Sequence, residues 1–335
     1  MSGNDSDSRY SRQQLLEEWD QTRFSEARVV IIGIGATGSV IASTLAMMGV
    51  GELVLVDMDT VELSNLSRQL LFQDTHISQF KVDAAKEILL KMNPEVKISS
   101  YNSSVQDLNP RVFNGTHVLV DGLDNFEARQ YINSVSIKKK IPLVSGGIFG
   151  WWGNIQVVIP DETPCLQCQQ LIPEERLKKS CTLPGEIRKD FEEEEEKFPA
   201  LASVGMVIGG LMAQEVVKLI LGKHEELLKE YLFWDGLKQA FTVIPLIKNP
   251  KCIVCSSKYL LEGIPYATSN QESLVDFLHR IKHAFNLEDP SFIHEAYELK
   301  MDNRQLGQIF KNGSVIYVND KTQPSPLKLK LILED

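Results

Sequence analysis

The feature that most constrains the fold of this chain is a series of short apolar segments separated by helix-like segments. Three of them, VVIIG (29–33), LVLVD (53–57) and HVLVD (117–121), are almost continuously apolar. Strands of this kind need a cover on both faces of a sheet, and the helices between them supply it. We therefore expect an α/β fold with a Rossmann-like, doubly wound parallel sheet.

The pattern changes after Gly150, where segments 155–160 and 241–246 are typical of antiparallel strands that extend the sheet. Between them, the apolar run 201–222 is long enough to cross a membrane. Charged residues such as Lys218 interrupt this run, so we expect a buried helix and no membrane partner.

A second unit follows a break near 256–267. It opens with a capping-box pattern, Ser269 and Glu272, before a helix-like run, and short strand-like segments follow. We divide the chain into a unit at 9–256, which opens with a helical leader, and a small α+β unit at 262–335.

The net charge of −10 limits the partners of the chain. Nucleic acids and anionic membranes are bound by basic surfaces, so we expect neither as a partner. The first ten residues are polar and lack the apolar core of a signal peptide. We therefore expect a cytoplasmic protein.

A glycine motif follows the first apolar strand directly. In GIGATG, Gly33, Gly35 and Gly38 form G-x-G-x-x-G ahead of a helix, which allows backbone N–H groups to approach a phosphate. Asp57 ends the next strand, at the distance typical of a carboxylate that binds a ribose. Alone, this pattern predicts a dinucleotide dehydrogenase. The six scattered histidines, however, offer no catalytic pair for nicotinamide chemistry.

Residues further along the chain favour a polyphosphate over a nicotinamide. Asn65, Arg68 and Lys81 follow the second strand and supply contacts of the kind that phosphates need. Cations at these positions would stabilise charge on an α-phosphate and on a leaving pyrophosphate. A surface ion pair remains the alternative for Arg68.

A further group follows the apolar segment HVLVD (117–121). DGLDNFEAR places Asp124, Asn125 and Arg129 at the carboxyl edge, where such sheets bind ligands. A carboxylate at Asp124 could hold magnesium against a triphosphate. The alternatives are a helix cap for Asp124 and a surface ion pair for Arg129.

Taken together, GIGATGS, VDMDTVELSNLSRQ, KVDAAKE and DGLDNFEAR resemble the adenylation domain of ubiquitin-activating enzymes. They equally resemble the ThiF- and MoeB-like bacterial enzymes that adenylate sulfur-carrier proteins. The resemblance covers roughly 9–256 and implies ATP and magnesium as cofactors. The residues that it assigns to ATP are Gly33, Gly35, Gly38, Asp57, Asp59, Asn65, Arg68, Lys81, Asp124, Asn125 and Arg129, with Asp124 as the magnesium ligand.

The leader segment RYSRQ resembles a family segment whose arginine reaches the phosphates across a dimer interface. The resemblance therefore implies Arg12 as that residue and a homodimer as the assembly. An incidental arginine on a surface helix is the alternative.

Four of the five cysteines form two C-x-x-C pairs that are far apart in the sequence. Four thiolates suit a tetrahedral structural zinc ion, which would have no open position for catalysis. A redox pair and an iron–sulfur cluster are the alternatives. The predicted zinc ligands are Cys165, Cys168, Cys252 and Cys255.

The fifth cysteine, Cys181, lies in the polar and cation-rich segment ERLKKSCTLPGEIRK. Neighbouring cations lower the pKa of a thiol and make its thiolate available. The segment CTLP resembles the catalytic loop of eukaryotic activating enzymes, although its proline is closer to the cysteine. We predict Cys181 as a thioester-forming nucleophile in a loop at about 169–203; a buried structural thiol is the alternative.

The unit at 262–335 resembles, in position and size, the ubiquitin-fold domain that recruits a conjugating enzyme. A dimerisation appendage is the alternative. The resemblance implies ATP-dependent activation of a ubiquitin-like protein that ends in Gly-Gly, then a thioester on Cys181 and transfer to the conjugating enzyme. The runner-up is an adenylyltransferase that activates a sulfur-carrier protein. A regulatory subunit is a third alternative.

Overall fold

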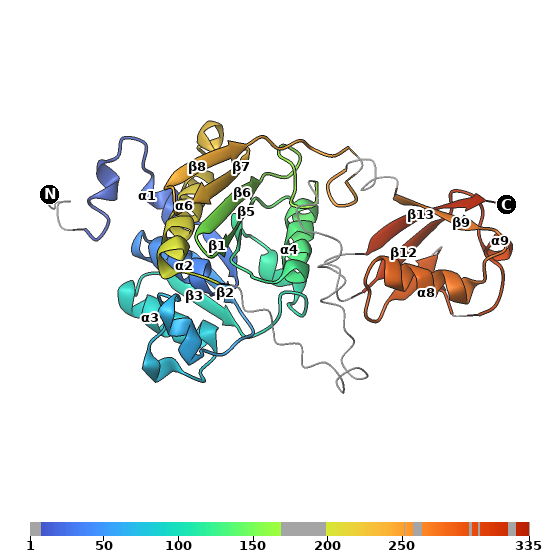
Figure 1. The fold of residues 1–335 in the computed structure, drawn as a ribbon, viewed down its shortest axis with the longest axis horizontal. Coiled ribbons are helices and arrows are strands. Elements are labelled where there is room, and N and C mark those ends of the chain that lie inside the picture. The colour runs from blue at the N-terminus through green and yellow to red at the C-terminus, as the bar shows by residue number, and fades with distance from the viewer. Residues whose placement is uncertain are drawn as a thin grey trace.

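The computed structural model describes residues 8–168, 199–250, 252–256, 263–294, 297–300, 302–320 and 326–334. These residues form an eight-stranded sheet in the first part of the chain and a five-stranded sheet in the last part. Figure 1 shows the two sheets side by side, with the N-terminal segment at the opposite end from the second sheet. Cys181 lies outside the described residues.

The first sheet has the strand order β3-β2-β1-β4-β5-β6-β7-β8. Strands β1 to β5 pair in parallel, and β6 to β8 extend the sheet in antiparallel pairs. The Rossmann-like sheet with an antiparallel extension is therefore confirmed. The strand bounds are β1 Arg28–Ile32, β2 Glu52–Val56, β3 Lys97–Tyr101, β4 Val118–Asp121, β5 Leu143–Phe149, β6 Trp152–Val158, β7 Tyr231–Asp235 and β8 Ala240–Ile244.

Helices cover both faces of this sheet, as the apolar strands require (Figure 1). Helices α2, α3 and α6 pack on one face, and α4 packs on the other. Glycines let α2 and α6 approach closely, since a Cβ at Gly209 would lie 2.8 Å from the Cβ of Val40. The α-helix bounds are α1 Gln21–Ser25, α2 Ala36–Met47, α3 Lys81–Met92, α4 Phe126–Lys139 and α6 Ala202–Leu221. Short 3-10 helices lie at Gln13–Leu15, Leu63–Ser67, Asp74–His76, Pro110–Phe113 and His224–Glu226.

Helix α6 is long and apolar enough to cross a membrane by length and composition alone. Most of it is buried, and it packs against α2 and the sheet in one hydrophobic core. Its charged Glu215 forms an ion pair with Lys218 and accepts a hydrogen bond from Leu228 N at 3.0 Å. The helix behaves as a core element, as predicted.

The connections of the sheet reverse direction between β1 and β4, which are neighbours. The chain winds from β1 towards β3 on one side and continues from β4 towards β5 on the other. In such sheets the crevice for ligands opens at the carboxyl ends of these two strands. The glycine loop after β1 and the loop after β4 both lie at this edge.

The second sheet has the spatial order β11-β10-β12-β13-β9. Strands β9 and β13, which come first and last along the chain in this sheet, pair in parallel. Helix α8 packs on one face through Leu274, Phe277 and Ile281. The element bounds are β9 Ile264–Ser269, α8 Leu274–Ala284, β10 Ser291–His294, β11 Tyr297–Glu298, α9 Leu306–Ile309, β12 Val315–Asn319 and β13 Leu327–Glu334.

Two local predictions for the helices are wrong. The N-cap of α8 is Ser273, whose side chain accepts a hydrogen bond from Asp276 N, whereas Ser269 ends β9 and Glu272 pairs with Arg280. The leader is not one helix, because Leu16 takes up an extended conformation after the first 3-10 turn and α1 starts only at Gln21.

The four cysteines of the two C-x-x-C pairs lie together at the α4 side of the first sheet. All are buried, and their sulfur atoms lie within 4.8 Å of one another. The Sγ separations are 3.6 Å for Cys165–Cys252, 3.3 Å for Cys168–Cys255 and 3.9 Å for Cys165–Cys168. Zinc–sulfur bonds of about 2.3 Å in a tetrahedron put sulfurs about 3.8 Å apart, so the cluster fits a structural zinc ion.

We expect Cys165→Ala to release zinc and to lower the midpoint of thermal unfolding by about 10 °C or more, because the ion ties together two distant segments. Zinc content by mass spectrometry and unfolding by circular dichroism test this. Ser256→Ala, which removes one hydrogen bond to Pro250 O in the same segment, is the matched control and should retain zinc. A Cys165→Ala protein with unchanged zinc content would contradict the assignment.

Candidate functional site

The glycine loop joins β1 to α2 with a sharp turn. Gly33 has a φ of +86°, and a Cβ at Gly38 would lie 2.0 Å from Gly33 O. Gly35 is the N-cap of α2, so the N–H groups of the first helical turn that follow it have no partner within the helix. The loop therefore presents backbone donors at the helix N-terminus, where an anion is stabilised.

Asp57 follows β2 and holds this loop. Its Oδ2 accepts a hydrogen bond from Ile34 N at 2.7 Å, and its Oδ1 accepts one from Asp59 N at 2.9 Å. Burial raises the pKa of Asp57, and the charge of Lys81 opposes this rise. Each carboxylate oxygen can accept a second hydrogen bond, so the predicted ribose contact is compatible with the geometry.

Lys81 is the first residue of α3 and lies beneath the loop that follows β2. Its Nζ lies 2.6 Å from Asp59 Oδ2, and its side chain is only 9% exposed, against 55% for Asp59. The structure therefore brings two sequence-predicted residues into one ion pair. The exposed carboxylate partially neutralises a buried cation that is directed towards the carboxyl edge of the sheet.

The segment Leu63–Ser67 forms a 3-10 turn that carries Asn65 and is followed by Arg68. Asn65 is buried, and its Oδ1 accepts a hydrogen bond from Glu62 N at 3.1 Å. Arg68 is half-buried and donates from one terminal nitrogen to Ser64 O at 2.7 Å. Asn65 thus stabilises the turn, while Arg68 keeps further donors available for a ligand.

The loop after β4 carries Asp124 and Asn125. Asp124 is exposed and has no hydrogen-bond or ion-pair partner among the residues that the structure describes. Asn125 is the N-cap of α4, with its Oδ1 accepting from Glu127 N at 2.9 Å and Ala128 N at 3.0 Å. The sequence left a helix cap as the alternative role for Asp124. In the structure Asn125, and not Asp124, caps this helix. A free carboxylate at the edge of the sheet suits a hard cation such as magnesium.

Arg129 does not form a surface ion pair. Its Nε lies 3.1 Å from Oδ2 of the fully buried Asp121, although the two groups are not aligned for a hydrogen bond. Its guanidinium also donates to Leu123 O at 2.5 Å and to Gly146 O at 3.0 Å. These contacts fix the loop after β4 from below, so Arg129 orients the site.

Sequence reasoning missed two buried polar residues beside the site. Asp121 ends β4, accepts a hydrogen bond from Ser145 Oγ at 2.6 Å and balances the charge of Arg129. Gln69 is 6% exposed, and its Oε1 has no partner among the described residues. The sequence signal that could have identified Asp121 is a charged residue at the end of an apolar strand. For Gln69 the sequence offered only its position next to Arg68.

Arg12 lies at the wrong end of α2 to reach the glycine loop of its own chain. Gln13 Nε2 donates to Met48 O, at the C-terminal end of α2, at 2.8 Å. Tyr10 Oη accepts from Asn93 Nδ2, at the end of α3, at 2.8 Å. A twelve-residue helix is about 18 Å long. Arg12 is exposed and is displaced from the glycine loop by about that length.

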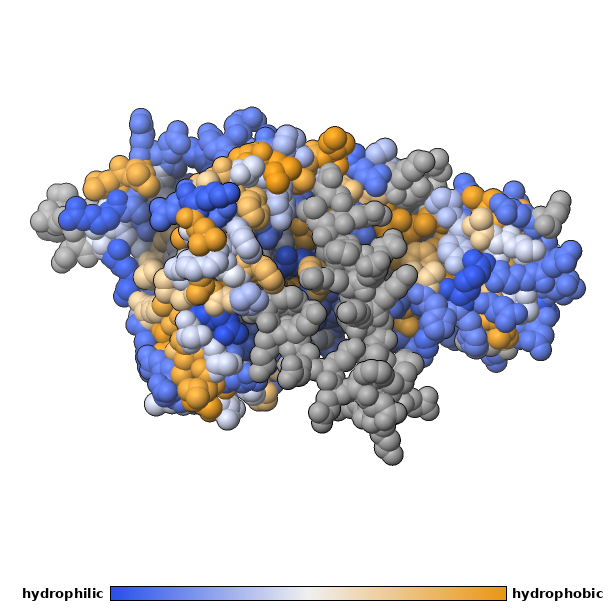
Figure 2. Space-filling view, viewed as in Figure 1, coloured by the Kyte–Doolittle hydropathy of each residue, from blue (hydrophilic) through white to orange (hydrophobic). Residues whose placement is uncertain are grey.

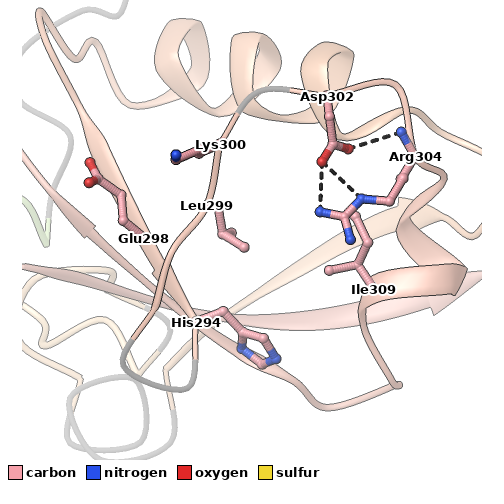
Figure 3. A pocket seen from close by; sticks show the side chains of 7 residues that line it. All are labelled: His294, Glu298, Leu299, Lys300, Asp302, Arg304 and Ile309. Carbon is pink, nitrogen blue, oxygen red and sulfur yellow. Dashed lines mark hydrogen bonds and ion pairs between the residues drawn. The ribbon is translucent and has the colours of Figure 1, made fainter.

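A separate hollow of 440 Å³ lies in the second unit (Figure 3). Two of its charged residues neutralise each other, since Arg304 lies with Nε 2.8 Å from Asp302 Oδ2. It contains none of the residues that the sequence predicted for nucleotide chemistry, so we place that chemistry at the first sheet. Its lining residues are His294, Glu298, Leu299, Lys300, Asp302, Arg304 and Ile309.

The fold of the first unit is shared with solved structures. The chain superposes on the E. coli MccB structure determined with ATP with a TM-score of 0.61 and 25% identity, over 76% of this chain and 75% of that chain. It superposes on E. coli MccB with the modified peptide MccA-N7isoASN with a TM-score of 0.62 and 24% identity, over 74% and 75% of the two chains.

The sequence also has named relatives. It is 34% identical to the SAMP-activating enzyme E1 of Haloferax volcanii over 79% of this chain and 96% of that protein. It is 34% identical to the molybdopterin-synthase adenylyltransferase of Escherichia coli over 74% of this chain and 95% of that protein. The ThiF family model matches residues 9–254, which include the glycine loop, the loops after β2 and β4 and three of the four clustered cysteines. The chain therefore belongs to the ThiF family.

Proposed function

We propose that the chain is an adenylyltransferase that activates the C-terminal carboxylate of a small ubiquitin-like or sulfur-carrier protein with ATP. One observation carries the proposal: Asp57 links the glycine loop to Asp59, which pairs with the buried Lys81, while the loop after β4 offers at Asp124 a carboxylate without a partner among the described residues. A dinucleotide needs no such set of groups. The named activities of the relatives, SAMP activation and adenylyl transfer, support it.

In the proposed reaction, a carboxylate oxygen of the substrate protein attacks the α-phosphorus of ATP. A new oxygen–phosphorus bond forms, the bond to the bridging oxygen breaks, and pyrophosphate leaves with its electron pair. Lys81 and Arg68 stabilise the charge that develops on the phosphates. Asp124 would hold magnesium, which would supply further positive charge to the phosphates. Arg129 and Asp121 keep the loop of Asp124 in position.

A protein substrate also needs a docking surface, and the last strands of the first sheet offer one. All residues of β8 are exposed, including the apolar Phe241, Val243 and Ile244. Figure 2 shows hydrophobic residues along the edge where β7 and β8 lie in Figure 1. Exposed apolar patches of this kind are typical of protein interfaces.

A homodimer would complete the site. Arg12 is anchored about one helix length from its own glycine loop, so it could reach phosphates only in a second copy of the chain. Several large apolar side chains are exposed near the leader and the loop after β2, as expected of an interface. They are Leu15, Leu16, Met47, Met58, Leu63, Leu70 and Phe80.

Two fates of the acyl adenylate are supported by different observations. The relatives named for sulfur-carrier adenylation and molybdopterin synthase favour attack by a sulfur donor and a thiocarboxylate product. The cation-rich sequence around Cys181 favours a thioester on that cysteine, formed with release of AMP. The comparisons weigh towards the first fate, and we rank it first.

The second unit would serve the thioester pathway by recruiting a conjugating enzyme. It lies beyond the family match, which ends at residue 254. Figure 1 shows this unit on the α4 side of the first sheet, and α4 begins at Phe126, directly after the loop that carries Asp124. A partner bound to this unit would be held close to the adenylate.

We expect Lys81→Ala to lower substrate-dependent ATP–pyrophosphate exchange by about a hundredfold, because it removes a buried cation from the phosphates. Exchange of radiolabelled pyrophosphate measures this. Lys91→Ala, on the same helix but exposed and paired with Glu87, should keep full exchange. Equal exchange in both variants would exclude the proposed role of Lys81.

The fate of the adenylate can be tested with ATP, magnesium and a carrier protein ending in Gly-Gly, with and without sulfide. A thiol-sensitive adduct on a non-reducing gel that disappears in Cys181→Ser, but not in Ser180→Ala, would establish the thioester. We expect instead exchange without an adduct, and a thiocarboxylate on the carrier, detected by mass spectrometry, when sulfide is added. A wild-type protein without pyrophosphate exchange would exclude both pathways.

Action of Arg12 in a second copy predicts complementation. Arg12→Ala and Lys81→Ala homodimers should each be nearly inactive, whereas a heterodimer of the two has one intact site. Random mixing should therefore restore about a quarter of the wild-type exchange. No recovery after subunit exchange, shown to be complete by native mass spectrometry, would contradict the action of Arg12 in a second copy.

A further inference from the structure

Two histidines lie one turn apart on the outer surface of helix α8. His279 and His283 are both exposed, and neither has a hydrogen-bond, ion-pair or ring partner within the part of the chain that the structure describes. Neither belongs to the nucleotide site or to the cysteine cluster. Neutral imidazole is a common ligand of copper, nickel and zinc ions, so two available rings on one helix point to a metal ion.

The helix that carries the pair is fixed on the second sheet (Figure 1). At its N-terminus, the side chain of Ser273 accepts a hydrogen bond from Asp276 N at 3.2 Å. Successive residues of an α-helix are rotated by about 100°, so both histidines lie on the side opposite the buried residues. These buried residues are Leu274, Phe277, Leu278 and Ile281.

The spacing of the two histidines suits chelation of a single ion. Residues four apart on an α-helix lie on one face, with their Cβ atoms about 5–6 Å apart. A metal ion bound about 2 Å from each ring nitrogen can lie between two such imidazoles. The zinc motif H-E-x-x-H uses the same spacing to bring two histidines to one ion.

The charged neighbours leave this side of α8 open to a cation. The guanidinium of Arg280 lies over the ring of Tyr266, with its Cζ 4.9 Å from the ring centre, and so points towards β9. Lys282 is half-buried and lies about 60° around the helix from His279. Asp276 is exposed and lies one turn before His279, so its carboxylate offsets positive charge beside the pair.

We propose that His279 and His283 together bind one divalent transition-metal ion of the class that prefers imidazole, namely copper, nickel or zinc. Two rings fill only part of the coordination sphere, so the other positions are open to water or to a donor of a partner molecule. The site thus differs from the cysteine cluster, which is buried and offers a closed set of four thiolates. A bound ion would clamp two successive turns of α8, and such a site does not depend on the proposed adenylyl transfer.

Relocation of one histidine separates a chelating pair from the number of histidines in the chain. The double substitution His283→Ala with Ala284→His keeps six histidines, but it moves one of them to about 140° around the helix from His279. We expect the zinc-loaded, full-length wild type to bind Ni²⁺ about a hundredfold more tightly than this variant or His283→Ala, because each variant lacks one ligand of the pair. Isothermal titration with Ni²⁺ alone measures the three affinities.

Amide hydrogen exchange locates the bound ion. Ni²⁺ should slow exchange in Leu274–Ala284 of the wild type and leave it unchanged in the relocated variant, since only the wild type can clamp two turns. Without added Ni²⁺, all three proteins should unfold at the same temperature, because both substituted positions are exposed. The zinc content, measured by mass spectrometry, should stay constant during the titration, which shows that Ni²⁺ has not entered the cysteine cluster.

Three results would overturn the paired site. The first is a wild-type protein that binds no Ni²⁺. The second is equal affinity in the wild type and the relocated variant, since the ion would then bind single histidines or other donors. The third is binding that leaves exchange in α8 unchanged, which would place the ion elsewhere. Weaker binding in both variants, together with slower exchange in the wild type alone, would establish the site.

Discussion

The geometry of the nucleotide site depends on one carboxylate, that of Asp57. Its two oxygens hold Ile34 N in the glycine loop and Asp59 N in the loop after β2. Asp59 in turn pairs with the buried Lys81, so a single side chain relates the helix N-terminus to the cation. Hydrogen bonds to a charged acceptor each contribute about 1.5–3 kcal/mol, which is enough to keep both loops fixed without a ligand.

A second buried charge, Asp121, does the same for the loop after β4. It lies at the end of a strand with no exposure and is balanced by Arg129. Buried pairs rarely gain stability over apolar residues, but the loss of one partner leaves a costly unpaired charge. The pair therefore fixes the orientation of the loop that carries Asp124, and the two acidic loops meet the glycine loop at one edge of the sheet.

Much of this arrangement could be predicted from the sequence. Strands that are apolar on both faces require a parallel sheet covered by helices, and two C-x-x-C pairs imply a four-sulfur cluster whatever their separation. The role of Arg129 could not be predicted, because this residue lies on α4 and its partners Asp121 and Gly146 lie on β4 and β5. Other details depend on which of two similar residues is used by a neighbouring element. Ser269 is the last residue of β9, so Ser273 caps α8. No pattern distinguished Gln69, since its isolation is visible only once the chain around it has packed.

The position of β13 has a consequence for the way the second unit is made. This strand comes last along the chain among the five described strands of its sheet, yet it lies inside the sheet, between β12 and β9. Leu329 in β13 pairs with Ile264 in β9. This pairing joins two strands that are far apart in the sequence, so all of the chain between them has to be looped out. During synthesis, β9 and α8 leave the ribosome long before their partner strand exists. Until then the apolar face of α8 has no complete sheet to cover it, so folding of this unit awaits the last strand, whereas the parallel core of the first unit is already complete.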